Sequence, residues 1–244
     1  IEIAKGPHSA QYGSDAIGGV VNVITKSGKT CDNGRDFCTT LSAGVSHPWG
    51  GHVGARIDGE TRDGTRFALG GRLFGTRGYN FTTIDNLFTY EPDDDGFIQG
   101  SIDFSLSKEF DWGEFFASGL YARSRVQYDD AGMWGGNQAD NDLFAGKLGV
   151  RVDHTDDWSS RLELSSGVDL QKNFRDETGY SDRFDTLRYG VFASTQKSFD
   201  IGETAHILTV GGELYREKVR SSVPYEVTAR DLAAAFAQHS LEFG

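Results

Sequence analysis

The chain has 244 residues, 37% of them apolar, and a formal net charge of −12. The length allows one large domain or two small ones, and the negative charge argues against nucleic-acid binding, which needs a basic face. No apolar run reaches roughly eighteen residues, which excludes a transmembrane helix. Thirty-two glycines and 12% aromatic residues, beside only four prolines, favour an all-β protein.

Two short strands joined by a compact polar segment are predicted near the N-terminus. Ile1–Ala4 and the β-branched run Val20–Thr25 are typical of strands, and Gly6-Pro7 is typical of a turn. Gly18-Gly19, just before the second strand, indicates a close backbone approach or a positive φ. A phosphate-binding loop is the alternative for a glycine-rich segment, but neither GKS/GKT nor a GxGxxG that opens a helix is present.

Cys31 and Cys38 are the only cysteines, and the residues between them favour a turn. Such a turn brings the two Cα atoms within disulfide range, and a disulfide implies an oxidising compartment. Free thiols are one alternative and zinc is another, because His47 and His52 follow at finger-like spacing. We predict the disulfide, since both histidines would lie about a strand's length away at roughly 3.3 Å per residue.

From residue 39 onward, apolar and polar residues alternate over long segments, which is typical of strands with one apolar face. The clearest strands are 144–153 and 161–170. Noisier alternation covers 39–46, 53–61, 66–77, 98–109, 115–127, 186–199 and 205–219. The sequence thus predicts about nine strands, many of them longer than the 3–10 residues that are usual in soluble sheets.

Tight turns alternate with long polar segments along this region. The turns are 62–65, 111–114, 155–158 and 200–203, and the long segments lie near 78–97, 128–142 and 173–184. In an up-and-down meander the short turns then gather at one rim and the long loops at the other, as in outer-membrane β-barrels. The turn spacing is also close to a β-propeller repeat, but each period holds two long strands rather than four short ones.

The predicted long loops carry two sets of candidate binding residues. The first is aromatic and fits flat or apolar ligands, although girdle aromatics at a membrane interface have the same composition: Tyr79, Phe81, Tyr90, Trp134 and Tyr180. The second is acidic and offers hard oxygen ligands for Ca²⁺, although solvated loop charge that bridges to lipopolysaccharide is the alternative: Glu91, Asp93, Asp94, Asp95, Asp129, Asp130, Asp140 and Asp142. The alanine-rich segment 229–241 predicts a short helix within a further loop.

The N-terminal segment IEIAKGPHSAQYGSDAIGGVVNVITKSG resembles, almost position for position, the C-terminal end of the plug domain of TonB-dependent outer-membrane receptors. That pattern is (V/I)-E-(V/I)-x-R-G-P-x-S-x-x-Y-G-x-x-A-x-G-G-V-(I/V)-N-(I/V)-I-T-K. The resemblance implies plug–barrel contacts for Glu2 and Lys5. Lys5 departs from the usual Arg, and it keeps the charge but loses the bidentate fork.

This resemblance implies three regions: residues 1–28 as the end of a plug domain, 29–38 as a linker, and 39–244 as the N-terminal portion of a receptor barrel. Such barrels belong to the 22-stranded class, so about nine strands cannot close around a plug. We therefore expect a partial antiparallel up-and-down transmembrane β-barrel, in a chain that is one part of a receptor.

The function that the resemblance implies is active import across the outer membrane of a Gram-negative bacterium, driven by TonB and the proton gradient. The TonB box is expected upstream of this chain. Family ligands are ferric siderophores, haem, cobalamin and similar compounds, cobalamin receptors order their loops with Ca²⁺, and the sequence does not choose among these ligands. No catalytic motif can be assigned, so no enzyme is expected. A passive porin and a soluble β-propeller binding protein are the alternatives.

Overall fold

The computed structural model describes residues 2–6, 18–22, 31, 36–83, 91–130 and 135–243. The regular secondary structure of these residues consists only of strands, which form two antiparallel sheets. The strands are β1 Glu2–Lys5, β2 Gly19–Asn22, β3 Phe37–Ser46, β4 Gly50–Glu60, β5 Thr65–Thr76, β6 Phe97–Phe110, β7 Gly113–Gln127, β8 Gln138–Thr155, β9 Trp158–Arg175, β10 Tyr180–Ile201, β11 Thr204–Ser221 and β12 Ala229–Phe243. Within the described ranges, no helix is long and apolar enough to cross a membrane.

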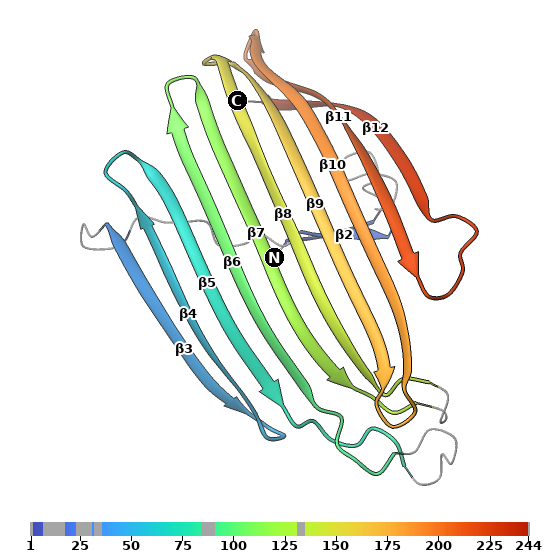
Figure 1. Cartoon of the computed structure of the whole chain (residues 1–244). Coiled ribbons are helices and arrows are strands. Elements are labelled where there is room, and N and C mark those ends of the chain that lie inside the picture. The colour runs from blue at the N-terminus through green and yellow to red at the C-terminus, as the bar shows by residue number, and fades with distance from the viewer. Residues whose placement is uncertain are drawn as a thin grey trace.

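Strands β3 to β12 form one open ten-stranded sheet in which every strand pairs with its neighbours in sequence (Figure 1). The all-β, up-and-down antiparallel architecture expected from the alternation is thus confirmed. The sheet has one strand more than predicted, because residues 229–243 also join it. The other sheet is the small antiparallel hairpin of β1 and β2, in register from Glu2 opposite Asn22 to Lys5 opposite Gly19.

The two ends of the large sheet differ as predicted. The connections β4–β5, β6–β7, β8–β9 and β10–β11 are tight and lie at the upper end in Figure 1, which we call the turn rim. The described residues 77–83, 91–96, 128–130 and 135–137 and the connections after β3, β9 and β11 lie at the opposite end, the loop rim. A meander must separate the two kinds of connection in this way, since each strand reverses the direction of the last.

The predicted helix at 229–241 is wrong, because these residues form strand β12. Its backbone pairs with β11 from Ala229 opposite Lys218 to Phe243 opposite Thr204. Alanine has a high helix propensity, but propensity is a weak prior that tertiary context overrides. Here the edge of β11 offers a row of unpaired backbone groups. The side chains of β12 alternate between the two faces of the sheet, and Phe236 stacks on Phe192 of β10 with ring centroids 6.0 Å apart.

Two predicted long loops are shorter than expected. In place of a loop at 173–184, β9 continues to Arg175 and β10 starts at Tyr180, joined by a turn in which Gly179 has φ 67°. Likewise β8 begins at Gln138, so Asp140 and Asp142 belong to a strand. The polar residues there suggested loops, but strands of this sheet extend past the apolar zone, where both faces are polar.

The large sheet has no conventional hydrophobic core. Among the described residues, no large side chain is fully buried, and the buried apolar residues are mostly alanines. Large apolar side chains are exposed instead, Leu41 by 81% and Val45 by 95%. Such a surface is unusual for a protein in water. It matches a sheet whose apolar face is covered by lipid.

The exposed apolar side chains form a continuous belt on one face of the sheet, the outer face. Register places them side by side across the strands: Val53, Leu73, Ile102, Phe104, Leu106, Leu148, Leu164, Val191 and Leu214. The neighbouring positions along each strand point to the other, inner face and are mainly polar or charged. Alternation with period two thus separates two chemistries across one layer of backbone.

The belt drifts toward the turn rim along the sheet. On β5 it ends at Phe67. Following the register across the sheet from Phe67 leads to Val191 on β10 and Leu214 on β11, where the belt continues to Leu208. Strands tilted by roughly 35–45° to a membrane normal produce this drift, because a horizontal layer then cuts each strand at a different residue.

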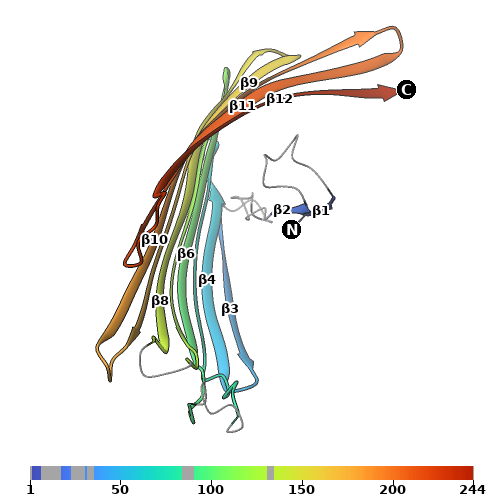
Figure 2. The ribbon, with the colours of Figure 1, turned by 90° about the vertical axis from the view of Figure 1, so that its right-hand side faces the viewer.

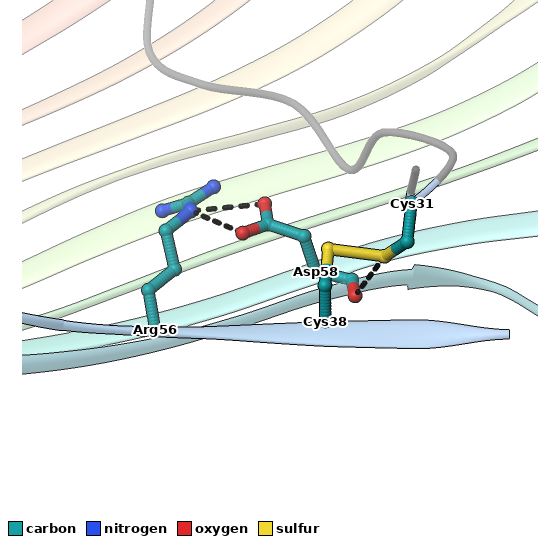
Figure 3. Close-up of a disulfide and its surroundings, with 4 residues drawn as sticks. All are labelled: Cys31, Cys38, Arg56 and Asp58. Carbon is teal, nitrogen blue, oxygen red and sulfur yellow. Dashed lines mark hydrogen bonds and ion pairs between the residues drawn. A yellow bond between two sulfur atoms is a disulfide. The ribbon is translucent and has the colours of Figure 1, made fainter. Parts of the chain in front are cut away.

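The sheet is curved, and the β1–β2 hairpin lies on its concave side (Figure 2). The inner face, which carries Cys38 and Asp58, is turned to this side (Figures 2 and 3). The β1–β2 hairpin thus lies beside the concave inner face of the large sheet, where a domain enclosed by a barrel would lie.

Candidate functional site

The junction between the N-terminal part and the wall is covalent. Cys31 and Cys38 form a disulfide with a Cα–Cα distance of 5.7 Å (Figure 3). Cys31 is only 7% exposed, and its Sγ lies 3.4 Å from the carbonyl oxygen of Asp58 on β4. Asp36 continues the ladder, since its carbonyl accepts a hydrogen bond of 3.0 Å from the backbone N–H of Glu60. The zinc alternative finds no support here, because His47 and His52 lie at the opposite rim.

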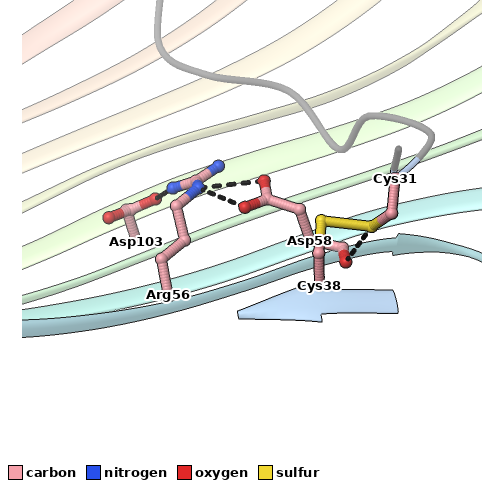
Figure 4. Close-up of polar contacts among 5 residues, drawn as sticks. All are labelled: Cys31, Cys38, Arg56, Asp58 and Asp103. Atoms are coloured by element: carbon pink, nitrogen blue, oxygen red, sulfur yellow. Dashed lines mark hydrogen bonds and ion pairs between the residues drawn. A yellow bond between two sulfur atoms is a disulfide. The ribbon is translucent and has the colours of Figure 1, made fainter. Parts of the chain in front are cut away.

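A charged cluster on the inner face lies directly beneath this disulfide. Arg56 donates through Nε to Asp58 at 2.9 Å and through Nη1 to Asp103 on β6 at 2.7 Å (Figure 4). Asp58 is only 5% exposed, so its carboxylate depends on the guanidinium for its partner. Gly70, on β5 between them, leaves the space, because a Cβ there would meet Asp103 Oδ1 at 2.5 Å.

Further ion pairs continue along the inner face. Glu163 binds Arg161 at 2.7 Å and lies 3.6 Å from Lys147, and Glu217 lies 3.7 Å from Arg188. These side chains are partly exposed, so each pair stabilises the sheet only weakly. Their common effect is a hydrated, charged wall on the side that faces the β1–β2 hairpin.

A second cluster lies at the loop rim, where one ligand oxygen each of Glu91, Asp93 and Asp129 falls within 4.8 Å of the others. The cluster is held by its surroundings. Arg175 at the end of β9 pairs with Glu91, which also accepts a hydrogen bond of 3.2 Å from Asn137 Nδ2. The Thr82 hydroxyl donates to Asp129 Oδ2, whereas the other oxygen of Asp129 is buried and has no partner among the described residues.

Electrostatics at this cluster disfavours the charged carboxylates. Burial raises the pKa of Asp93, and the nearby charges of Glu91 and Asp129 raise it further. Burial also raises the pKa of Asp95, opposed by a hydrogen bond of 3.4 Å from the backbone N–H of Phe81. Three carboxylates therefore meet with Arg175 as their one close cation among the described residues. Such a group favours a bound cation or a proton.

The remaining acidic candidates are separate from this group. Asp94 lies 3.9 Å from Arg77, and Asp130 is not part of the three-carboxylate group. Asp140 accepts a bidentate pair of hydrogen bonds from Arg125, and Asp142 accepts one from the Tyr121 hydroxyl at 2.5 Å. Both belong to the outer face of β8, in register with the basic residues of β7. The structure therefore does not bring Asp140 and Asp142 together with Glu91, Asp93 and Asp129.

The aromatic candidates lie at the loop rim where they are described. The rings of Tyr79 and Phe81 contact each other with centroids 4.3 Å apart, and the Tyr180 hydroxyl donates to Asp182 at 3.0 Å. Tyr90 and Trp134 lie outside the described residues. Near the first pair is a cavity of about 790 Å³, lined mainly by polar residues: Arg77, Asn80, Asp93, Asp94, Arg125 and Gln127.

Glu2 and Lys5 both belong to β1. The Lys5 side chain is exposed, and that of Glu2 is outside the described set. Their contacts with the barrel wall therefore stay a prediction.

Several residues of these clusters were not foreseen. Arg56 and Asp58 stand on β4 and Asp103 stands on β6, so the cluster forms only across the register of three neighbouring strands. Their one signal in the sequence is a charge at a polar position of an alternating strand, which many other residues share. Arg175 and Asn137 were hidden in segments expected to be loops.

The chain was compared with known proteins. No family model matches it. Its fold is similar to that of the siderophore receptor PiuA from Acinetobacter baumannii, with a TM-score of 0.65 and 14% sequence identity over 96% of this chain. The chain spans 42% of the length of that receptor. At this identity the likeness shows the fold alone, an all-β up-and-down antiparallel sheet of the kind found in that receptor.

Proposed function

We propose that this chain is part of an outer-membrane receptor that imports a scarce ligand with energy supplied through TonB. The observation that carries the proposal is the combination of an outward apolar belt with a charged, concave inner face beside the β1–β2 hairpin. The belt fits a lipid bilayer, and the hairpin has the sequence pattern of a plug. Residues 1–28, 29–38 and 39–244 then act as plug end, linker and wall.

Charged contacts between the inner face and a plug suit an importer better than apolar packing would. A plug that must move needs contacts with the wall that are numerous but individually weak, and partly exposed ion pairs in water are each worth about 1 kcal/mol or less. Apolar packing would instead hold the plug in one position. The buried Arg56 cluster is the exception, and it lies where the linker is covalently fixed.

The ligand is proposed to bind at the loop rim, where the rings of Tyr79 and Phe81 offer an aromatic surface and polar side chains lie nearby. Aromatic rings with a few directed polar groups suit a metal chelate or a vitamin. The name of PiuA favours a ferric siderophore over haem or cobalamin. In this proposal the protein binds and releases its ligand and changes no covalent bond.

We also propose that Glu91, Asp93 and Asp129 hold a Ca²⁺ ion that orders the loops. Carboxylate oxygens are the ligands that Ca²⁺ prefers, and the unpartnered oxygen of Asp129 and the mutual repulsion that raises the pKa of Asp93 both favour a cation bound here. Asp129→Asn should abolish saturable Ca²⁺ binding in a titration of the purified protein. Asp94→Asn, which alters a carboxylate outside the group, should preserve it.

The import proposal is tested in cells that express the whole protein carrying this chain. Uptake of radioactive iron supplied as a siderophore should stop when TonB is deleted or the proton gradient is collapsed, whereas binding to the cell surface should persist. The porin alternative predicts that uptake continues without TonB. Swelling of vesicles that contain the protein, in isotonic sugar, provides a second readout, since an open pore admits sugar and a plugged receptor does not.

A further inference from the structure

Two histidines from different strands meet on the outer face at the turn rim. His206 on β11 and His239 on β12 approach with Nδ1 of the first 2.9 Å from Nε2 of the second. In the register His206 is opposite Leu241 and His239 is opposite Leu208, so the two histidines are diagonal neighbours. Diagonal neighbours on one face lie within reach of ring-bearing side chains.

The two rings are held in place by their surroundings. Phe199 on β10 stacks on His206 with centroids 5.1 Å apart and an angle of 12°, and His206 stacks on His239 with centroids 5.1 Å apart and an angle of 22°. This row of three rings fixes the imidazoles before any ligand arrives. Donors held in advance lose little conformational entropy on binding.

The pair is accessible to water. His239 is exposed and His206 is half-buried, and their outer-face neighbours include one charged residue beside apolar ones. The polar neighbour is Lys197 on β10, which is opposite Leu208 and whose Nζ binds Asp157 at 2.6 Å. The charge of Lys197 is therefore engaged and does not repel a cation at the histidines.

The place of the pair in the topology suggests what a bound ion would do. Strands β11 and β12 are connected at the loop rim, through residues 222–228, so the end near the histidines is the open end of this hairpin. The histidines are 33 residues apart in sequence. A link between them would close a long loop and hold β12 on β11 where the backbone connection does not.

We propose that His206 and His239 form a two-imidazole site for a transition-metal ion of the Zn²⁺ class, with water completing the coordination. Imidazole suits Zn²⁺, Ni²⁺ and Cu²⁺ and not the hard ions Ca²⁺ and Mg²⁺. Two Zn–N bonds of about 2.0–2.1 Å at a tetrahedral angle separate the donors by about 3.3 Å. The observed 2.9 Å needs only a small opening of the pair. This inference does not depend on the import function.

Zn²⁺ titration tests the site in the whole detergent-purified protein after treatment with a chelator, with a competing fluorescent indicator as the readout. The wild-type protein should bind Zn²⁺ at one site. The affinity of this site should be at least about tenfold lower in His206→Gln and in His239→Gln. His154→Gln is the matched control, because His154 also lies at the turn rim but its Nε2 contacts the Ser160 hydroxyl at 2.9 Å. That variant should bind like the wild type.

A second measurement is independent of the variants. Zn²⁺ should slow hydrogen exchange of the amides near His239 in the wild-type protein at least severalfold, and Ca²⁺ should not. Absence of saturable Zn²⁺ binding, or unchanged affinity in either His206→Gln or His239→Gln, would overturn the proposal and leave a plain hydrogen bond between two imidazoles.

Discussion

The inner and outer faces of the ten-stranded sheet are made by the same strands, often by adjacent residues, and they follow opposite rules. On β11, Val210 lies on the outer face among other apolar side chains, and Thr209 lies on the inner face with its hydroxyl 3.4 Å from Gln196 Oε1. In the proposed receptor, the outer face gains stability from contact with lipid, whereas the inner face gains it from water and ion pairs. The comparison teaches that the polarity of each position is set by what lies beyond the sheet.

The largest effect is expected when a charge is placed on the apolar outer face. Val210→Arg should lower the free energy of unfolding in lipid vesicles by about 2–4 kcal/mol, because a charge on the lipid face of a barrel is costly near the bilayer midplane. Thr209→Arg adds the same side chain one residue away, on the inner face, and should cost less than about 1 kcal/mol. Urea unfolding measures both. Equal losses in the two variants would contradict the assignment of the faces.

The next effect concerns the covalent junction on the inner face. Replacing Cys31 and Cys38 by serine should lower the stability of the wall–linker junction by roughly 2.5 kcal/mol, the loop-closure estimate for an eight-residue loop. Thiol titration of the denatured, unreduced wild-type protein should find no free cysteine. Two titratable thiols would show that the disulfide does not form in the cell.

Beneath the junction, Arg56→Met should destabilise the inner face by about 2 kcal/mol. This is less than the 3–5 kcal/mol typical of a fully buried pair, because Asp103 is partly exposed to water. Arg151→Met removes an exposed arginine from the same kind of pair with Glu114 and should cost less than about 1 kcal/mol. Unfolding by urea compares the two, and equal values would mean that the Arg56 cluster is no more than surface charge.

The smallest effect sharpens the contrast between the wall and the loop rim. Asp93 has a raised pKa in the folded protein, so its charged form destabilises the loops at pH values above the raised pKa, and this penalty is lost as the pH falls from the raised value to the unfolded pKa of 3.8. Asp93→Asn should therefore slow hydrogen exchange of the loop amides at pH 7 without metal, and the gain should vanish near pH 4. Asp94→Asn, at a carboxylate outside the group of Glu91, Asp93 and Asp129, should change little, and a larger gain there than at Asp93 would contradict the cluster.

The fold was largely predictable because alternation is a local property. Apolar and polar residues alternate so regularly in 144–153 and 161–170 that the two faces of each strand can be assigned from the sequence. The tight turns show where the chain reverses direction. Segment 229–241 was wrongly predicted to be a helix. Many of its residues are alanines, so apolar and polar side chains do not alternate clearly along it. Loop 173–184 was misread because its residues are polar on both faces, as strands beyond the lipid zone are.

The clusters were less predictable than the strands. Cys31 and Cys38 are near each other in sequence, so their pairing was visible as a turn. Glu91, Asp93 and Asp129 were recognised as acidic, but nothing in their spacing said that Asp129 joins the first loop whereas Asp140 pairs with Arg125. That choice depends on which residue of one strand is opposite which residue of the next.

The sequence by itself determined the class of sheet, the two faces of its strands and the division into turn rim and loop rim, because each depends on residues within a few positions of one another. Only the tertiary structure decided that residues 229–243 extend the sheet, that Arg56 bridges Asp58 to Asp103, and that His206 meets His239. Register decides these contacts. A shift of one residue between neighbouring strands would exchange every inner for every outer side chain, and the sum of many pairings across the sheet, rather than any local signal, selects the register that is observed.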